Sequence, residues 1–217
     1  MRSGTLVAAP DIARVRGETL MTPTDDELWT RSREGDASAF GLLFQRHARA
    51  IYNYCFRRLG SWTTAEDMLS VVFLEAWRRR DTELPPEKVL PWLYGVATNV
   101  IRNQRRSERR YAAALSRMSK IEPEPDFADS AVNRLDDERQ ARAALGFLGK
   151  LPKREQDVIV LCTVEELSYE DAALALDLPI GTVRSRLSRA RAHLRELDPG
   201  CGHNQGDSTA LQEAQQP

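Results

Sequence analysis

Several residue types that mark whole classes of protein are scarce in this chain of 217 residues. Its three cysteines, Cys55, Cys162 and Cys201, are far apart and form no CxxC pair, so neither a disulfide framework nor a zinc ribbon is expected. No run of about 18 apolar residues is present, which argues against a transmembrane helix. The first 23 residues lack the apolar core of a signal peptide. Together these absences predict a cytoplasmic protein without a membrane span.

Motifs that mark common enzyme families are also missing from the sequence. It contains no P-loop, no GxGxxG, no HExxH and no GxSxG. The three histidines, His47, His193 and His203, are isolated from one another, and the pair Cys201-x-His203 is interpreted as incidental. We therefore predict that the protein is not an enzyme and has no catalytic residues, no metal and no cofactor.

The charge of the whole chain is close to zero, but the charges are separated along it. With 31 basic and 32 acidic residues the net charge is −1, which taken alone argues against a nucleic-acid binder. Residues 101–117, however, hold six arginines and one acid, and residues 184–195 hold five arginines and no acid. Residues 118–138 hold seven acids and two basic residues. The electrostatic field depends on these local clusters, so two basic segments remain candidates for nucleic-acid contacts.

Apolar residues recur with a period near 3.6 in several segments, which is typical of amphipathic helices. Thr24 and Thr63 each stand three residues before a glutamate, as in a capping box, and Gly60 is a typical residue at a helix end. In the first part of the chain, helices are predicted over Ala39–Leu59, Ala65–Arg79 and Trp92–Arg110.

The segment IEPEPDFADS interrupts the helical pattern with prolines and acids, and no strand-like alternation stands out. The sequence therefore predicts an all-α protein with two small helical domains joined by an acidic flexible linker. The predicted divisions are a disordered leader at 1–23, a first domain at 24–112, the linker at 113–139, a second domain at 140–198 and a disordered tail at 199–217.

A helix-turn-helix is predicted near the end of the second domain. Ser168–Leu178 forms the first helix, Pro179-Ile180-Gly181 the turn, and Thr182 caps a second helix over Val183–Leu194. On a helical wheel Val183, Leu187, Ala190 and Leu194 share one buried face, while the outer face carries small residues and arginines. Small side chains allow a helix to enter the major groove, and arginine can bind guanine or phosphate.

Two helices of the first domain carry further candidate surfaces. On Ala65–Arg79, Val71 and Leu74 point outward beside charged residues, which favours either a partner protein or a deeper local bundle. On Trp92–Arg110, Asn99 and Asn103 lie one turn apart, where their amides could read base edges. The arginines that follow could hold the neighbouring phosphates.

Both blocks resemble a known family. AEDMLSVVFLEAWRR…PWLYGVATNVIRNQRR resembles region two, and LPKREQDVIVLCTVEELSYEDAALALDLPIGTVRSRLSRARAHLRE resembles region four, of bacterial sigma factors of the extracytoplasmic-function (ECF) group of the sigma-70 family. The resemblance covers roughly three-fifths of the chain and includes the order of the blocks. The family's docking helix commonly has Gln-Glu where this chain has Ser70-Val71.

The resemblance implies a protein that binds core RNA polymerase and directs promoter-specific initiation, with an anti-sigma factor as a possible partner. By position, Asp67, Ser70, Val71, Leu74 and Glu75 would face the polymerase. The melted minus-ten strand would be bound by Asn99, Arg102, Asn103, Arg105 and Arg106. The duplex minus-thirty-five element would be read in its major groove by Arg184, Ser185, Ser188, Arg189 and Arg191.

Two other functions fit parts of the pattern. A conventional helix-turn-helix transcription regulator would be a dimer that binds DNA without polymerase, and an interaction protein or nucleic-acid enzyme would use the arginine helix for anchoring. The linker suggests one further expectation, that its acids shield the arginine clusters in the free protein.

Overall fold

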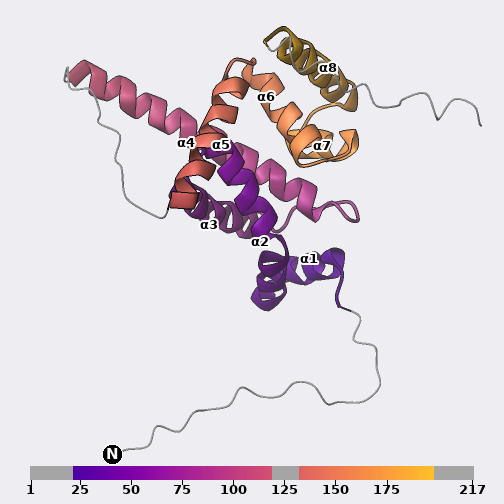
Figure 1. Cartoon of the computed structure of the whole chain (residues 1–217). Coiled ribbons are helices and arrows are strands. Elements are labelled where there is room, and N and C mark those ends of the chain that lie inside the picture. Colours follow the sequence, from indigo (N-terminus) through magenta and orange to yellow (C-terminus); the bar gives the residue numbers. More distant parts are fainter. Residues whose placement is uncertain (1–21, 119–131, 198–217) are drawn as a thin grey trace, which may run out of the picture.

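The computed structural model describes residues 22–118 and 132–197, and all regular secondary structure in these two ranges is helical (Figure 1). The predicted all-α fold is confirmed. The predicted leader, the tail and the centre of the predicted linker lie outside the described residues. Both ends of the 113–139 segment are helical, because one helix continues to Met118 and the next begins at Val132.

The N-terminal block consists of helices α1 (Asp25–Arg33), α2 (Ala37–Leu59), α3 (Trp62–Arg78) and α4 (Val89–Met118). The capping box of Thr24 and Glu27 is confirmed, and Gly60 ends α2 in the left-handed conformation with φ 68°. The capping box at Thr63 is wrong. Helix α3 begins two residues earlier than that box implies, because the Ser61 side chain accepts a hydrogen bond from the Thr64 backbone N–H.

Buried side chains from all four helices make the core of this block. Leu28 of α1, Ile51 of α2, Val72 of α3 and Leu93 of α4 are each almost completely buried. The hydroxyl groups of Tyr54 and Thr98 are 2.8 Å apart, so this buried polar pair is satisfied. The fully buried Cys55 thiol has its pKa raised to about 12 by burial. A thiol of that kind packs as a small apolar group.

The C-terminal block consists of α5 (Val132–Gly149), α6 (Lys153–Ile159), the π-helix η1 (Val160–Val164), α7 (Tyr169–Leu176) and α8 (Ile180–Leu197). The Ser168 side chain caps α7 by accepting from the Asp171 N–H, as predicted. The predicted cap at Thr182 is wrong, because α8 already begins at Ile180. Asp177, with φ 53°, supplies the left-handed residue of the turn.

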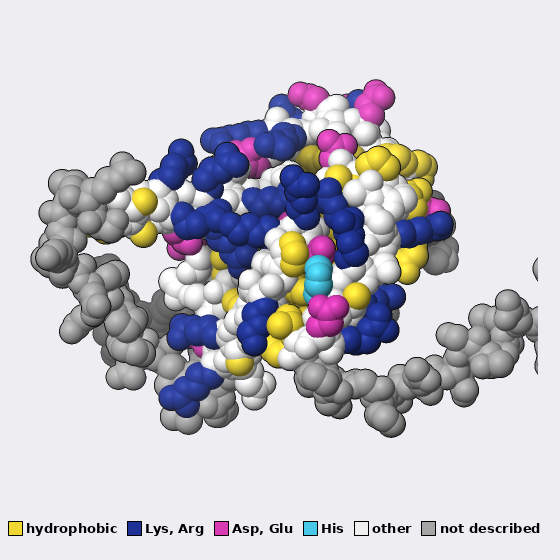
Figure 2. Space-filling model, turned by 90° about the horizontal axis from the view of Figure 1, so that it is seen from above, with side chains coloured by type: hydrophobic (Ala, Val, Ile, Leu, Met, Phe, Trp, Pro, Cys, Tyr) yellow, Lys and Arg dark blue, Asp and Glu magenta, His cyan; other side chains and the backbone are white. Residues whose placement is uncertain are grey.

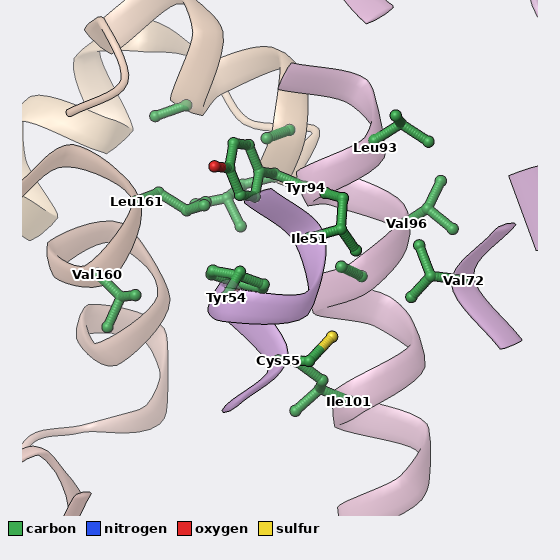
Figure 3. Close-up of a cluster of buried hydrophobic side chains, with 14 of the residues drawn as sticks. Ile51, Tyr54, Cys55, Val72, Leu93, Tyr94, Val96, Ile101, Val160 and Leu161 are labelled. Carbon is green, nitrogen blue, oxygen red and sulfur yellow. The ribbon is translucent and has the colours of Figure 1, made fainter. Parts of the chain in front are cut away.

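The two blocks pack against each other, with α4 along α7 and α5 along α2 (Figure 1). Their apolar residues belong to one continuous cluster, in which Leu161 of η1 points toward Tyr54 and Tyr94 of the N-terminal block (Figure 3). Gly95 of α4 permits the close approach, because a Cβ there would lie 2.4 Å from the carbonyl oxygen of Ala175 in α7. The described residues therefore form a closed arrangement of the two blocks.

Candidate nucleic-acid interface

Helix α8 is held by one apolar face against the rest of the C-terminal block. Val183, Leu187 and Ala190 are at most 2 % exposed, as the helical wheel predicts. Leu194, which the wheel places on the same face, is only half-buried near the end of the helix. The buried alanines Ala172 and Ala175 of α7 leave room for the close approach of its neighbours. The structure thus presents a helix-turn-helix with α8 as the outer helix, which is the helix that enters the major groove in such motifs.

The outward face of α8 carries all five residues predicted for the minus-thirty-five element, and all five side chains are exposed: Arg184, Ser185, Ser188, Arg189 and Arg191. Arg189 donates from Nε to the Ser185 carbonyl at 3.2 Å. The Arg184 guanidinium lies 5.7 Å from the ring centre of Tyr169, a cation–π contact that orients it. Tyr169 was not among the predicted residues, because its only sequence signal is an aromatic side chain next to the cap of α7.

A second basic surface follows α4, and Figure 2 shows Lys and Arg side chains gathered over one face of the molecule. The predicted minus-ten residues share one wall of a cleft of about 810 Å³ between α4 and α6. Four of them are exposed and the fifth, Arg105, is half-buried: Asn99, Arg102, Asn103, Arg105 and Arg106. The cleft also includes Arg58 and Lys153. These residues could not be grouped with the others from the sequence, because they are distant from α4 along the chain.

A buried carboxylate of the C-terminal block binds two arginines of this cleft. Asp157 of α6 accepts from Arg102 through Nη2 at 2.6 Å and Nε at 3.0 Å, and its other oxygen pairs with Arg58. Arg58 is 3 % exposed and Asp157 is 5 % exposed. Arg105 donates to the Arg58 carbonyl, and burial together with the Arg58 charge lowers the pKa of Arg105. In the closed arrangement Arg102 is therefore engaged by protein.

Two more acids of the C-terminal block bind the N-terminal block. Glu165, which follows the π-helix, accepts from Arg57 at 2.8 Å and from the Tyr94 hydroxyl at 2.9 Å. Burial and the Glu165 charge raise the pKa of Tyr94.

Asp171 of α7 accepts from Lys88 at 2.8 Å. Burial alone would raise the pKa of Asp171, but the bonds from Lys88 and Ser168 outweigh it and lower that pKa. In the described residues, the ion pairs that join the two blocks thus use acids of α6, α7 and the connection between them. Residues 119–131 of the predicted linker lie outside the described ranges.

The residues predicted to face polymerase lie on the outer side of α3. Val71 and Leu74 are 38 % and 49 % exposed, and Asp67 and Ser70 are exposed as well. Glu75 is half-buried and pairs with Arg78 at 2.9 Å. Nearby on α2, Phe44 is 40 % exposed and packs edge-on against Phe73 of α3. An exposed apolar strip bordered by charges is a surface suited to a protein partner.

Comparison with known proteins assigns both blocks. Residues 43–111 match the model of Sigma-70 region 2, and residues 141–194 match that of Sigma-70, region 4. The RNA polymerase sigma factor CarQ of Myxococcus xanthus is 31 % identical over 77 % of this chain and 93 % of its own length. The ECF RNA polymerase sigma factor SigW of Bacillus subtilis is 30 % identical over 76 % of this chain and 91 % of its own.

The chain belongs to the ECF group of sigma-70 family sigma factors. This ECF sigma factor binds core RNA polymerase and DNA and directs promoter recognition and transcription initiation, as a subunit without enzymatic activity. This family assignment replaces two alternative interpretations of the sequence, a conventional helix-turn-helix regulator and a nucleic-acid enzyme.

Solved structures agree with the assignment of this sigma factor. CnrH in complex with the cytosolic domain of CnrY has a TM-score of 0.59 and 27 % identity, over 80 % of this chain and 96 % of that one. The sigma factor RpoE of Bartonella quintana, solved with the anti-sigma factor NepR, has a TM-score of 0.53 and 25 % identity, over 73 % of this chain and 95 % of that one. Within 22–118 and 132–197, no helix is long and apolar enough to cross a membrane.

Proposed function

We propose that α8 reads the minus-thirty-five element as duplex DNA in the major groove. The observation that supports this best is the outward face of α8, where Ser185 and Ser188 are exposed among arginines while the opposite face is buried. Small side chains let the helix axis approach the bases, and an arginine fork matches the two acceptors of guanine. Tyr169 contributes by orienting Arg184.

Replacing Arg189 by alanine is expected to cost about 1–3 kcal/mol of binding free energy at one minus-thirty-five base pair. The reason is that Arg189 is exposed on the outer face with its Nε bonded to the helix backbone, which directs its terminal nitrogens outward. Transcription in vitro with core polymerase over a library of singly substituted promoters measures this loss. Arg49→Ala, an equal charge change at an exposed position of α2, is the control. A uniform loss over all promoters would show that Arg189 holds phosphate instead.

We propose that the exposed face of α4 binds the melted minus-ten strand. Asn99 and Asn103 offer amides to unpaired bases, while Arg105 and Arg106 hold the adjoining phosphates. Arg102 would join them only after it leaves Asp157. On this proposal the closed arrangement is a state of the free protein, and the two blocks separate on the promoter.

We propose that α3 docks on core polymerase through Val71 and Leu74, with Asp67, Ser70 and Glu75 at the rim. Leu74→Asp is expected to weaken binding to core polymerase by about tenfold or more, because a charge in an apolar contact costs over about 1.4 kcal/mol. Fluorescence anisotropy with labelled protein and core polymerase measures the affinity. Leu197→Asp changes a similarly exposed leucine at the end of α8 and serves as the control. Equal affinities of the two variants would contradict the assignment.

The remaining proposals concern organisation and partners. Residues 24–112 act as the polymerase and minus-ten domain, 140–198 as the minus-thirty-five domain, and 113–139 as the connection between them. We propose a cytoplasmic location, where core polymerase resides, and an anti-sigma factor as a regulator, because the RpoE structure contains one.

Purified protein added to core polymerase should redirect initiation to a distinct promoter set, and failure to do so would contradict the promoter assignments.

A further inference from the structure

The cleft between α4 and α6 has the dimensions of a small-molecule site. Its volume is about 810 Å³, within the roughly 300–1,000 Å³ typical of ligand pockets. Both blocks contribute to its lining: Arg102 and Arg106 belong to α4, whereas Lys153 and Gln156 belong to α6. The cleft in this form exists only while the blocks are closed.

The lining of this cleft carries a large excess of positive charge. Seven basic residues face two acids, the basic residues being Arg58, Arg79, Arg102, Arg105, Arg106, Arg109 and Lys153. Asp157 divides its carboxylate between Arg58 and Arg102, and the other acid, Glu108, accepts from the Gln104 amide at 3.0 Å. Arg79 pairs with Glu75 at 3.6 Å, outside the lining. Three carboxylates therefore face seven basic residues, and more than half of the positive charge is left without compensation.

The buried part of the cleft shows the effect of this excess. Arg58 is 3 % exposed, and its Nε has no hydrogen-bond partner in the described structure. The neighbouring positive charge of Arg58, added to burial, lowers the pKa of Arg105. A buried cation with an unused donor is costly, and a second anion beside Asp157 would relieve that cost.

We propose that this cleft binds a small oligophosphate, with a chain of phosphates like that of a nucleoside polyphosphate, and that the bound anion holds the two blocks closed. Arginine forks match phosphate oxygens in pairs, and several phosphates in a row can contact arginines of α4 and Lys153 of α6 together. The consequence for DNA rests on the proposed function: the anion occupies arginines proposed for the minus-ten strand and so opposes promoter engagement.

Isothermal titration of the full chain with inorganic tripolyphosphate, at constant ionic strength, tests this proposal. Saturable binding of one anion per chain is expected, and Lys153→Glu should weaken it by about tenfold, as expected for loss of a charge-assisted contact. Lys150→Glu is the matched control, because it makes the same charge change three residues away and Lys150 does not line the cleft. Equal weakening by both variants, or no saturation, would overturn the proposal and indicate general charge attraction.

Two further arms separate the alternatives. Single-stranded DNA of ten nucleotides distinguishes a free oligophosphate from a nucleic-acid backbone. If this DNA bound the free chain in a way that depended on Lys153, while tripolyphosphate did not bind, the proposal would be overturned. Circular dichroism establishes that Lys153→Glu folds, as expected for an exposed first-turn residue of α6. Tripolyphosphate binding needs neither polymerase nor promoter, so it can fail while the promoter assignments stand. Equally, the promoter assignments can fail while tripolyphosphate still binds.

Discussion

Replacing Asp157 by asparagine is expected to lower the free energy of unfolding by about 3–5 kcal/mol, the usual cost of removing one partner from a buried ion pair. Asparagine has nearly the same shape, so packing is kept while the negative charge is lost. Arg58, which is 3 % exposed, would then remain buried without a counter-charge, and Arg102 would lose its 2.6 Å contact. Urea denaturation followed by circular dichroism measures the change through its midpoint.

The control for this experiment is an exposed pair of the same chemistry. Glu83 pairs with Arg33 at 3.3 Å, and the Glu83 side chain is 87 % exposed. Glu83→Gln should change stability by less than about 1 kcal/mol, because water already solvates both charges. A loss for Asp157→Asn no greater than that of the control would show that Asp157 does not hold the blocks together.

The parts of the fold that depend on local pattern could be predicted from the sequence. The buried face of α8 follows from the spacing of Val183, Leu187 and Ala190, and the cap at Ser168 follows from its polar side chain before an acidic first turn. The errors at Thr63 and Thr182 are errors of two and three residues in where a helix begins. At α3 several polar residues stand near the boundary, and the backbone geometry rather than residue type makes Ser61 the cap. At α8 the helix begins directly after Pro179, before the polar Thr182 that the sequence offers as a cap.

The contact between the blocks could not be predicted, because its partners are far apart in the chain. Asp157 lies 99 residues from Arg58, and Glu165 lies 108 residues from Arg57. Neither acid belongs to a long acidic run, whereas the acidic linker stands out by composition, so the sequence predicts that the linker does the shielding. Only the tertiary arrangement shows that Asp157 engages Arg102, a residue that sequence position had assigned to DNA.

Gly95→Ala is expected to separate the two blocks without altering any charge. The new Cβ would lie 2.4 Å from the carbonyl oxygen of Ala175 and 3.1 Å from its Cα, and these are backbone atoms that move only if α7 moves. In solution the change should appear as a larger radius of gyration in X-ray scattering. The released Arg102 should also raise the affinity for a minus-ten single strand by about tenfold, because a charge-assisted bond of about 1.5–3 kcal/mol no longer competes for it.

Gly41→Ala provides a matched control, because Gly41 also lies inside a helix but a Cβ there would meet nothing within 4 Å. Alanine at that position should stabilise α2 by up to about 1 kcal/mol and leave the scattering curve unchanged. If Gly95→Ala were as compact as Gly41→Ala, the contact of α4 with α7 would not determine the closed arrangement. If Gly95→Ala expanded but bound the single strand no better, Asp157 would not be what limits access of that strand to Arg102.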